Sequence, residues 1–299
     1  MWTHTITGDN FLFDKVMASR SRPAVLSITT RFCLPHEGMT TLDYLSSGSA
    51  VVLRNSMNSS LSIITSHHVA CPWMFPKYFA SMWDWLQFVN EDHVRHSLQL
   101  LIEDNANSGP KVLLDLPLAH QVQTHGSRDL ALLSLKDSAA IEIWRQAEQE
   151  LKLQPLMLQQ MPCERGDPLI FSGHKQLFND QKDIGGYQIP KTVRGHFVGR
   201  STSRQEFAWS QELLEEGMCG GAVISSVSGQ CVGIIEGIVP TIRKEDEDSL
   251  LHDEKALGSW KMRQALAGHV AFIPASDVRE FIKNPDGLLL TGMELPLFM

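Results

Sequence analysis

A cysteine flanked by glycines is the part of this sequence best suited to chemistry. Residues 216–222 read Glu-Gly-Met-Cys-Gly-Gly-Ala, with Cys219 between Gly217 and Gly220. The glycines allow a tight turn that exposes a side chain and directs backbone N–H groups toward one point. A thiol there can act as a nucleophile and attack a carbonyl carbon.

A cysteine nucleophile needs a base, and the base needs an acceptor that orients it. Residues 63–69 form an apolar strand that runs into a short turn carrying His67 and His68. Farther along, Asp129 opens the strongly apolar segment 130–135. Each piece alone also fits a structural role, because histidines end many strands, aspartates open many turns and thiols are often buried. The three pieces in this order indicate a nucleophile, a base and an orienting acid.

The elements that must position these residues read as strands. Many short apolar runs are broken by Gly, Pro, Asn and Ser, which is typical of an all-β protein. Three segments differ: residues 78–103 indicate a helical insertion followed by a strand, residues 138–153 a helix, and residues 241–255 a solvated charged loop. The predicted strands are Ala24–Thr29, Ser49–Arg54, Ser62–Thr65, Leu130–Leu135, Pro168–Ser172, Gly195–Gly199, Ala222–Ser225, Cys231–Glu236 and Val270–Ile273.

In this order the segments resemble trypsin-like peptidases of the HtrA/DegP type. Residues 65–69 (Thr-Ser-His-His-Val) are similar to the TNxHV motif of that family, which selects His68 as the base. Four other segments are similar to motifs of that family: residues 48–52 to its GSGFV motif, 129–133 to DxAvL, 166–173 to GDxVxAIG and 268–274 to GxxFAIP. The resemblance runs from Arg22 to Lys283 and implies an all-β fold, the chymotrypsin/trypsin-like double β-barrel, with a helical insertion and a C-terminal helix.

The resemblance also implies a division of the chain. We expect no PDZ domain after the second barrel. The predicted units are an N-terminal extension (1–21), a first β-barrel (22–137) with an insertion at about 73–103, a helical linker (138–153), a second β-barrel with the C-terminal helix (154–285) and a tail (286–299).

The nucleophile position departs from the family because it holds cysteine, as in picornavirus-type cysteine proteases that share the fold and the turn. A histidinium beside a thiol favours the thiolate. The resemblance therefore implies an endopeptidase that hydrolyses peptide bonds through a thioacyl-enzyme, with the triad His68, Asp129 and Cys219 and an oxyanion hole made by Gly217 and Cys219.

The predicted substrate pocket gives conflicting signals. Its wall should come from Leu213 and Leu214 before the turn, and from Glu236 and Gly237 at the end of a strand. The leucines favour an apolar substrate side chain, whereas the acid favours a basic one or disturbs Asp129. The residue preferred before the scissile bond stays open at this point.

A second hypothesis keeps the fold and removes the activity. Folds of this kind also serve as binding modules. The chain would then be a catalytically inactive trypsin-like domain, a structural or interaction subunit of a larger complex. The segment Trp73–His96, rich in aromatic residues, would be its contact surface, or else a local satellite core.

Composition excludes several other classes. With 26 basic and 34 acidic residues the net charge is −8, which argues against nucleic acid as a partner. No apolar run reaches the ~18 residues of a membrane span. The expected partner is a polypeptide substrate or a protein, and self-association or membership of a large complex stays open.

Cysteine and histidine usage bear on compartment and cofactors. Five cysteines, an odd number without a CxxC pair, indicate free thiols in an intracellular reducing compartment (cytosol, nucleus or organelle matrix) rather than a secreted protein. Twelve histidines include no HExxH motif, and His67 and His68 should point to different faces of an extended strand. We expect no metal and no cofactor.

Overall fold

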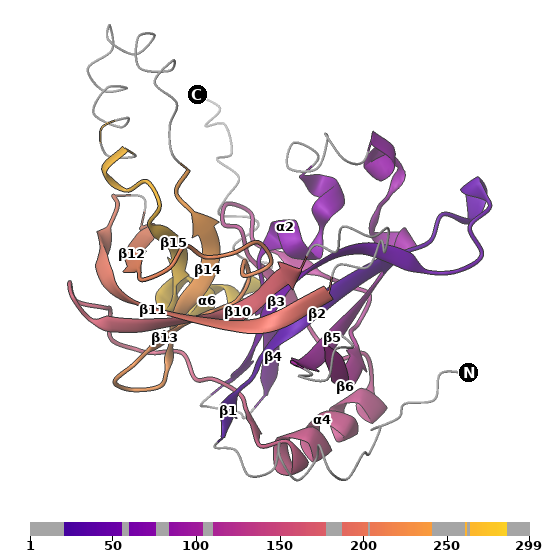
Figure 1. Cartoon of the computed structure of the whole chain (residues 1–299). Coiled ribbons are helices and arrows are strands. Elements are labelled where there is room, and N and C mark those ends of the chain that lie inside the picture. Colours follow the sequence, from indigo (N-terminus) through magenta and orange to yellow (C-terminus); the bar gives the residue numbers. More distant parts are fainter. Residues whose placement is uncertain are drawn as a thin grey trace, which may run out of the picture.

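The computed structural model describes residues 21–55, 60–75, 84–103, 110–177, 187–202, 204–240, 261 and 264–285. In these described residues strands predominate over helices (Figure 1). The main elements are β1 (Arg22–Pro23), β2 (Val25–Phe32), β3 (Asp43–Arg54), β4 (Leu61–Thr65), α2 (His67–Ala70), β5 (Val94–Ile102), β6 (Lys111–Pro117), β7 (Gln123–Thr124), β8 (Ala131–Leu133), α4 (Ser138–Glu150), β9 (Leu153–Gln154), β10 (Pro168–Leu177), β11 (Tyr187–Arg200), β12 (Glu206–Ser210), β13 (Ala222–Ser225), β14 (Cys231–Ile238), β15 (Val270–Pro274) and α6 (Ala275–Lys283).

The C-terminal half of the strands forms a closed barrel. Its order is β10-β11-β12-β15-β14-β13, and every neighbouring pair is antiparallel. Inward-facing apolar side chains such as Phe171, Val223 and Phe272 are buried in its own core. The alternation along each strand that buries one face accounts for this packing.

The N-terminal half forms a sheet in the order β6-β5-β2-β3-β4-β8-β7. A single antiparallel bridge between Leu118 and Leu135 brings the chain after β6 back to the chain after β8. The amide of Ala119 reinforces it by donating to the carbonyl of Ser134 at 2.8 Å. This bridge turns the sheet into a second barrel, so the predicted double β-barrel of chymotrypsin type is confirmed.

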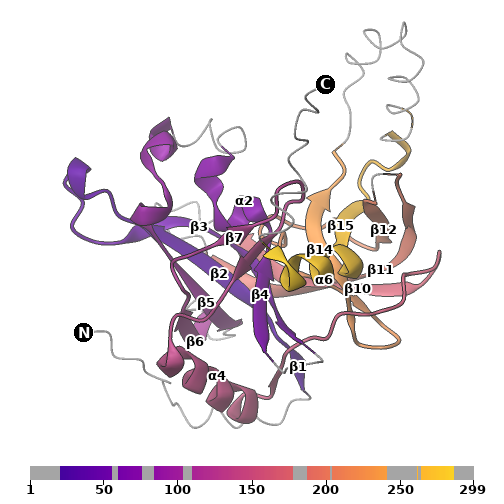
Figure 2. The ribbon, with the colours of Figure 1, turned by 180° about the vertical axis from the view of Figure 1, so that it is seen from behind.

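A third apolar core lies between the two barrels. First-barrel residues such as Val51 and Ile64 meet second-barrel residues such as Ile234 there. The helix α6 adds Val278 and Phe281, both with no exposed surface. Figure 2 shows α6 at the junction, beside β4 on one side and β14 on the other. The predicted C-terminal helix therefore holds the barrels together.

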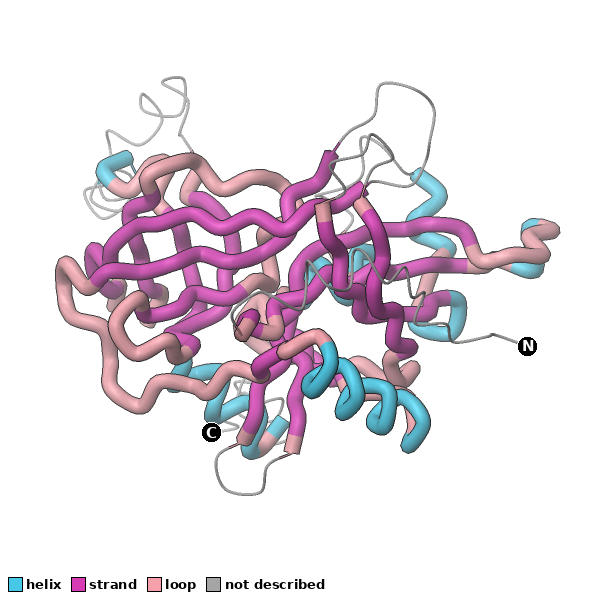
Figure 3. The backbone as a smooth tube through the Cα atoms, turned by 60° about the horizontal axis from the view of Figure 1, so that its bottom comes forward, coloured by secondary structure: helices cyan, strands magenta, loops and turns pink. Residues whose placement is uncertain are grey.

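The helix α4 packs on the outer surface of the first barrel. In Figure 3 it is the long cyan helix that lies outside the magenta strands. Asp137 caps its first turn by accepting a hydrogen bond from the amide of Ala140 at 3.0 Å. Its apolar face buries Ala140, Trp144 and Ala147, which follow helical spacing.

In its described residues, 73–75 and 84–103, the insertion contains less helix than the sequence predicts. Its described part contains only short 3-10 helices, at Pro72–Met74, Asp84–Phe88 and Glu91–His93, before β5. Trp85 stacks on Phe32 with ring centroids 4.7 Å apart, over a small satellite core. The strands β11 and β3 are longer than the strands predicted from the sequence at Gly195–Gly199 and Ser49–Arg54. The loop 241–255, the N-terminal extension before residue 21 and the tail 286–299 lie outside the described residues.

Candidate active site

The cysteine turn requires its glycines. Gly217 and Gly220 have φ angles of +92° and +81°, a region that favours glycine. A Cβ atom on Gly220 would lie 2.2 Å from the carbonyl oxygen of Ser49 and 2.3 Å from Oγ1 of Thr65. The turn thus packs directly against the first barrel, which brings Cys219 to the junction between the barrels.

His68 is held by Asp129 at two points. Its ring Nδ1–H donates to Oδ2 of Asp129 at 2.6 Å, and its backbone N–H donates to Oδ1 at 2.9 Å. Both side chains are mostly buried. With Nδ1 occupied, Nε2 is the ring nitrogen left to exchange a proton with a nucleophile.

The ring of His68 also interacts with Cys219. Burial alone would lower the pKa of His68, but hydrogen bonds to Asp129 and Cys219, together with their charges, raise it to about 10. The three residues predicted from the sequence are therefore brought together by the fold. An imidazolium at neutral pH beside a thiol is the arrangement that a Cys⁻/His⁺ pair needs.

Cys219 differs from the buried thiols of this chain. It is partly exposed, whereas Cys71 and Cys231 are buried. Burial raises the pKa of Cys71, Cys163 and Cys231 to about 12 in each case. Those three thiols are held protonated, which leaves them poor nucleophiles.

The neighbouring His67 has a different environment. It begins the short helix α2 rather than continuing the strand, so the expectation that the two histidines point to opposite faces of a strand is wrong. Its ring meets Phe75 edge-on at 4.8 Å, and Nε2 is buried with no hydrogen-bond partner among the described residues. Burial lowers its pKa.

The turn leaves two backbone donors for an oxyanion. The carbonyl of Glu216 accepts from the amide of Gln176 at 2.8 Å, and the carbonyl of Met218 accepts from Gly221 at 3.1 Å. In a trans peptide the N–H points away from the C=O, so the amides of Gly217 and Cys219 turn away from those partners. Within the described part of the chain, neither amide donates a hydrogen bond.

Ser49 links the turn to the first barrel, a role that sequence reasoning missed. Its hydroxyl donates to the carbonyl of Gly217 at 2.7 Å and accepts from the amide of His174 at 2.8 Å. Its own amide donates to the carbonyl of Cys219 at 3.1 Å. Thr65, three residues before the base, donates its hydroxyl to the carbonyl of Ser49 at 2.6 Å. One residue thus connects the strand that leads to His68 with the cysteine turn.

The residues predicted to line the substrate pocket differ in their exposure to solvent. Leu213 is 67% exposed, but Leu214 is buried in the core of the second barrel. Gly237 is half-buried at the end of β14. Glu236 is half-buried as well, and its Oε2 atom has no partner in the described residues. Burial raises its pKa, and the charge of Asp129 raises it further. The Glu236 carboxyl therefore lies within the electrostatic influence of Asp129.

Three other observations bear on function. A hollow of about 800 Å³ lies away from the triad, lined by residues such as Leu53, Met157 and Arg279. Among the described residues there is no group of three His, Cys, Asp or Glu that could hold a metal ion. No helix in that part of the chain has the length and apolar character needed to cross a membrane.

The fold and the site together define a double β-barrel of chymotrypsin type with a Cys-His-Asp constellation at the junction of its barrels. No family model and no curated protein matches the sequence. Among solved structures, the chain is similar to a serine endoprotease from Yersinia pestis, at 14% identity and a TM-score of 0.42. That similarity covers 94% of this chain and 67% of the other. The fold assignment rests on strand order and barrel closure.

Proposed function

We propose that the chain is a cysteine endopeptidase of the trypsin-like fold, with Cys219 as nucleophile, His68 as base and acid, and Asp129 as orienting carboxylate. The observation that carries the proposal is the position of the His68 ring, bonded to Asp129 on one side and to Cys219 on the other. Neither residue is among the buried residues of a barrel core, although Cys219 packs against the core of the first barrel. A purely structural role does not require the hydrogen bond between the two side chains.

The proposed reaction follows from these contacts. The Sγ thiolate of Cys219 attacks the peptide carbonyl, and the oxygen that becomes negative is stabilised by the amides of Gly217 and Cys219. The imidazolium of His68 then gives its Nε2 proton to the leaving amine, and a thioester with Cys219 remains. Water, deprotonated by the now neutral His68, hydrolyses the thioester and releases the acid product. Asp129 keeps the proton on Nδ1 throughout, so that Nε2 faces the reacting atoms.

The proposed compartment follows from the thiols. All five cysteines lie in the described part of the chain, and none is in a disulfide. Free thiols persist where the surroundings are reducing. We infer an intracellular reducing compartment, which expression with a localisation tag would test directly.

Thiol labelling tests the function without knowledge of the natural substrate. Iodoacetamide should alkylate Cys219 far faster than Cys163, which is also half-buried but has a raised pKa. In a His68→Ala variant we expect the rate at Cys219 to fall by roughly 10²-fold or more, in the range lost when a general base is removed. Cys163→Ser is the matched control and should leave the rate at Cys219 unchanged.

A second measurement separates the enzyme from the inactive scaffold. A peptide library would be incubated with the protein and with Cys219→Ala, and cleavage products would be identified by mass spectrometry. Cleavage by the wild type alone supports an endopeptidase. Equal labelling of Cys219 in the wild type and in His68→Ala, with no cleaved peptide, would refute the proposal and favour an interaction subunit.

A further inference from the structure

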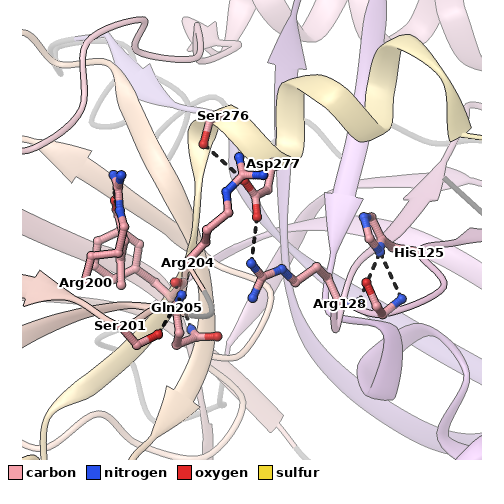
Figure 4. Close-up of polar contacts among 11 residues, drawn as sticks. His125, Arg128, Arg200, Ser201, Arg204, Gln205, Ser276 and Asp277 are labelled. Carbon is pink, nitrogen blue, oxygen red and sulfur yellow. Dashed lines mark hydrogen bonds and ion pairs between the residues drawn. The ribbon is translucent and has the colours of Figure 1, made fainter. Parts of the chain in front are cut away.

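The residue before Asp129 is tied to the C-terminal helix by a buried carboxylate. Nη2 of Arg128 lies 2.9 Å from Oδ2 of Asp277, and Nη2 of Arg204 lies 2.7 Å from Oδ1 of the same side chain. The Ser276 hydroxyl also donates to Oδ1 at 3.1 Å. Figure 4 shows the two arginines reaching Asp277 from opposite sides, Arg128 from the first barrel and Arg204 from the second.

Asp277 itself has little freedom to move. It is buried in the first turn of α6, where the helix N-terminus favours a negative charge. One residue later Val278 enters the core between the barrels, and Phe281 follows on the same face, both without exposed surface. The carboxylate is therefore a fixed point on the second barrel to which a first-barrel loop is attached.

The loop attached there is the one that carries Asp129. The Nδ1 atom of His125 accepts from the backbone amides of Ser127 and Arg128, each at 3.1 Å. The ring of His125 packs against Phe281 of α6 with centroids 5.3 Å apart. Arg128 is thus held by its backbone at His125 and by its guanidinium at Asp277.

The position of Asp129 depends on that attachment. Both of its carboxylate oxygens are used by His68, at 2.6 Å and 2.9 Å. Such double contact tolerates little displacement, and Arg128 is the adjacent residue in the chain. Reaction rates respond to shifts of about 1 Å in a reacting group by up to about 10²-fold.

We propose that Asp277 is a positioning residue for the Cys-His-Asp site: through Arg128 it fixes the loop in which Asp129 orients His68. This rests on the proposed function, which assigns the triad. The role explains why one buried carboxylate receives two arginines. Arg204 neutralises it within the second barrel, and Arg128 uses it as an anchor across the junction.

The two arginines provide a matched pair of variants. Arg128→Met and Arg204→Met each remove one guanidinium from the same carboxylate, but only Arg128 lies next to Asp129. Asp277→Asn keeps the shape of the side chain and removes its charge. If Asp277 only held the two barrels together, both arginine substitutions would change the site to a similar extent.

The first readout is independent of catalysis. In protein labelled with ¹⁵N at histidine, the Nδ1–H proton of His68 bonded to Asp129 should resonate far downfield, and its absence in His68→Ala assigns it. In Asp277→Asn and Arg128→Met we expect its exchange with water to become about tenfold faster or more, as after loss of a charge-assisted anchoring hydrogen bond. In Arg204→Met the exchange rate should stay within about twofold of the wild type.

The alkylation rate of Cys219 is the second readout, and it should fall in the same two variants but not in Arg204→Met. The double variant Arg128→Met/Asp277→Asn should be no slower than either single variant, because the two residues act as one unit. Should Arg128→Met be too unstable, Arg128→Lys keeps the charge with a single donor group and should show a smaller change of the same sign.

The outcomes separate the two proposals. Unchanged Nδ1–H exchange in Asp277→Asn, or an equal change in Arg204→Met, would overturn the positioning role whether or not the protein is an enzyme. Altered exchange with no reaction at Cys219 in any form would support the positioning of His68 by Asp277 and contradict the endopeptidase proposal instead.

Discussion

Ser49 offers the sharpest test of how the cysteine turn is held. Replacing it by alanine removes a hydroxyl that is fully buried, donates to the carbonyl of Gly217 at 2.7 Å and accepts from the amide of His174 at 2.8 Å. Alanine leaves both backbone groups buried without a partner. Each such group costs about 1–3 kcal/mol, so for the two groups the free energy of unfolding should fall by about 2–6 kcal/mol.

The neighbouring Ser46 is a matched control. It lies on the same strand and is also buried, but its hydroxyl has no hydrogen-bond partner among the described residues. Ser46→Ala removes an unsatisfied polar group, so stability should change by less than about 1 kcal/mol, with a gain the favoured sign.

Denaturant unfolding of the two variants measures both numbers. The midpoint should fall in Ser49→Ala with an unchanged slope, because the same surface is exposed on unfolding. The alkylation rate of Cys219 should fall too, since the Gly217 peptide loses its anchor. Equal stabilities of Ser49→Ala and Ser46→Ala would refute the reasoning that this hydroxyl holds the turn.

Three further predictions concern backbone conformation and pH. Gly220→Ala should destabilise the protein by about 4 kcal/mol or more, because φ is +81° and the new methyl group would collide with the backbone of Ser49. Gly229→Ala, at φ +69° but with open space around it, should cost only about 1–2 kcal/mol. Similar losses of stability in the two variants, measured by thermal unfolding, would contradict the contact argument. The raised pKa of His68 means that its imidazolium stabilises the fold fully below about pH 6.5, the ordinary value, and that this contribution is lost as pH rises through about 10; the stability difference between wild type and His68→Ala should therefore shrink over that range, and a constant difference would argue against the ion pair. Burial lowers the pKa of His174 to about 3 and of His96 to about 4, so the unfolded chain takes up these protons first and stability should fall as pH drops below about 6.5; His96→Gln/His174→Gln should show a shallower acid slope in pH-dependent unfolding, and an identical slope would count against the assignment.

The fold could be predicted because its signals are local. Strands such as β4 and β14 alternate or run apolar within a few residues, and turn residues mark their ends. The glycines at positions 217 and 220 predict a turn with positive φ from the sequence alone, and the structure has positive φ at both. The predicted strand Gly195–Gly199 is shorter than β11, because pairing with β10 extends β11 beyond its apolar centre. The predicted strand Leu130–Leu135 is longer than β8.

The surroundings of the site could not be predicted in the same way. Leu213 and Leu214 are adjacent and chemically identical, yet one is exposed and the other lies in the core of the second barrel. Glu236 belongs to the strand expected at a substrate pocket, but its carboxyl is governed by burial and by the charge of Asp129. The sequence carries no sign of either, because both depend on which side of a strand faces the neighbouring element.

The sequence by itself determined the residue types of the site and their order: a histidine after one strand, an aspartate before another and a cysteine in a glycine turn. Only the tertiary structure decided that these residues meet. His68 and Asp129 are 61 positions apart and come within 2.6 Å because β4 pairs with β8. Cys219 joins them because the two barrels share the apolar core that contains Ile64, Ile234 and Phe281. Ser49 and Asp277 make their contacts at the same junction between the barrels. A local sequence pattern cannot predict these contacts, because the partner residues are distant in the chain.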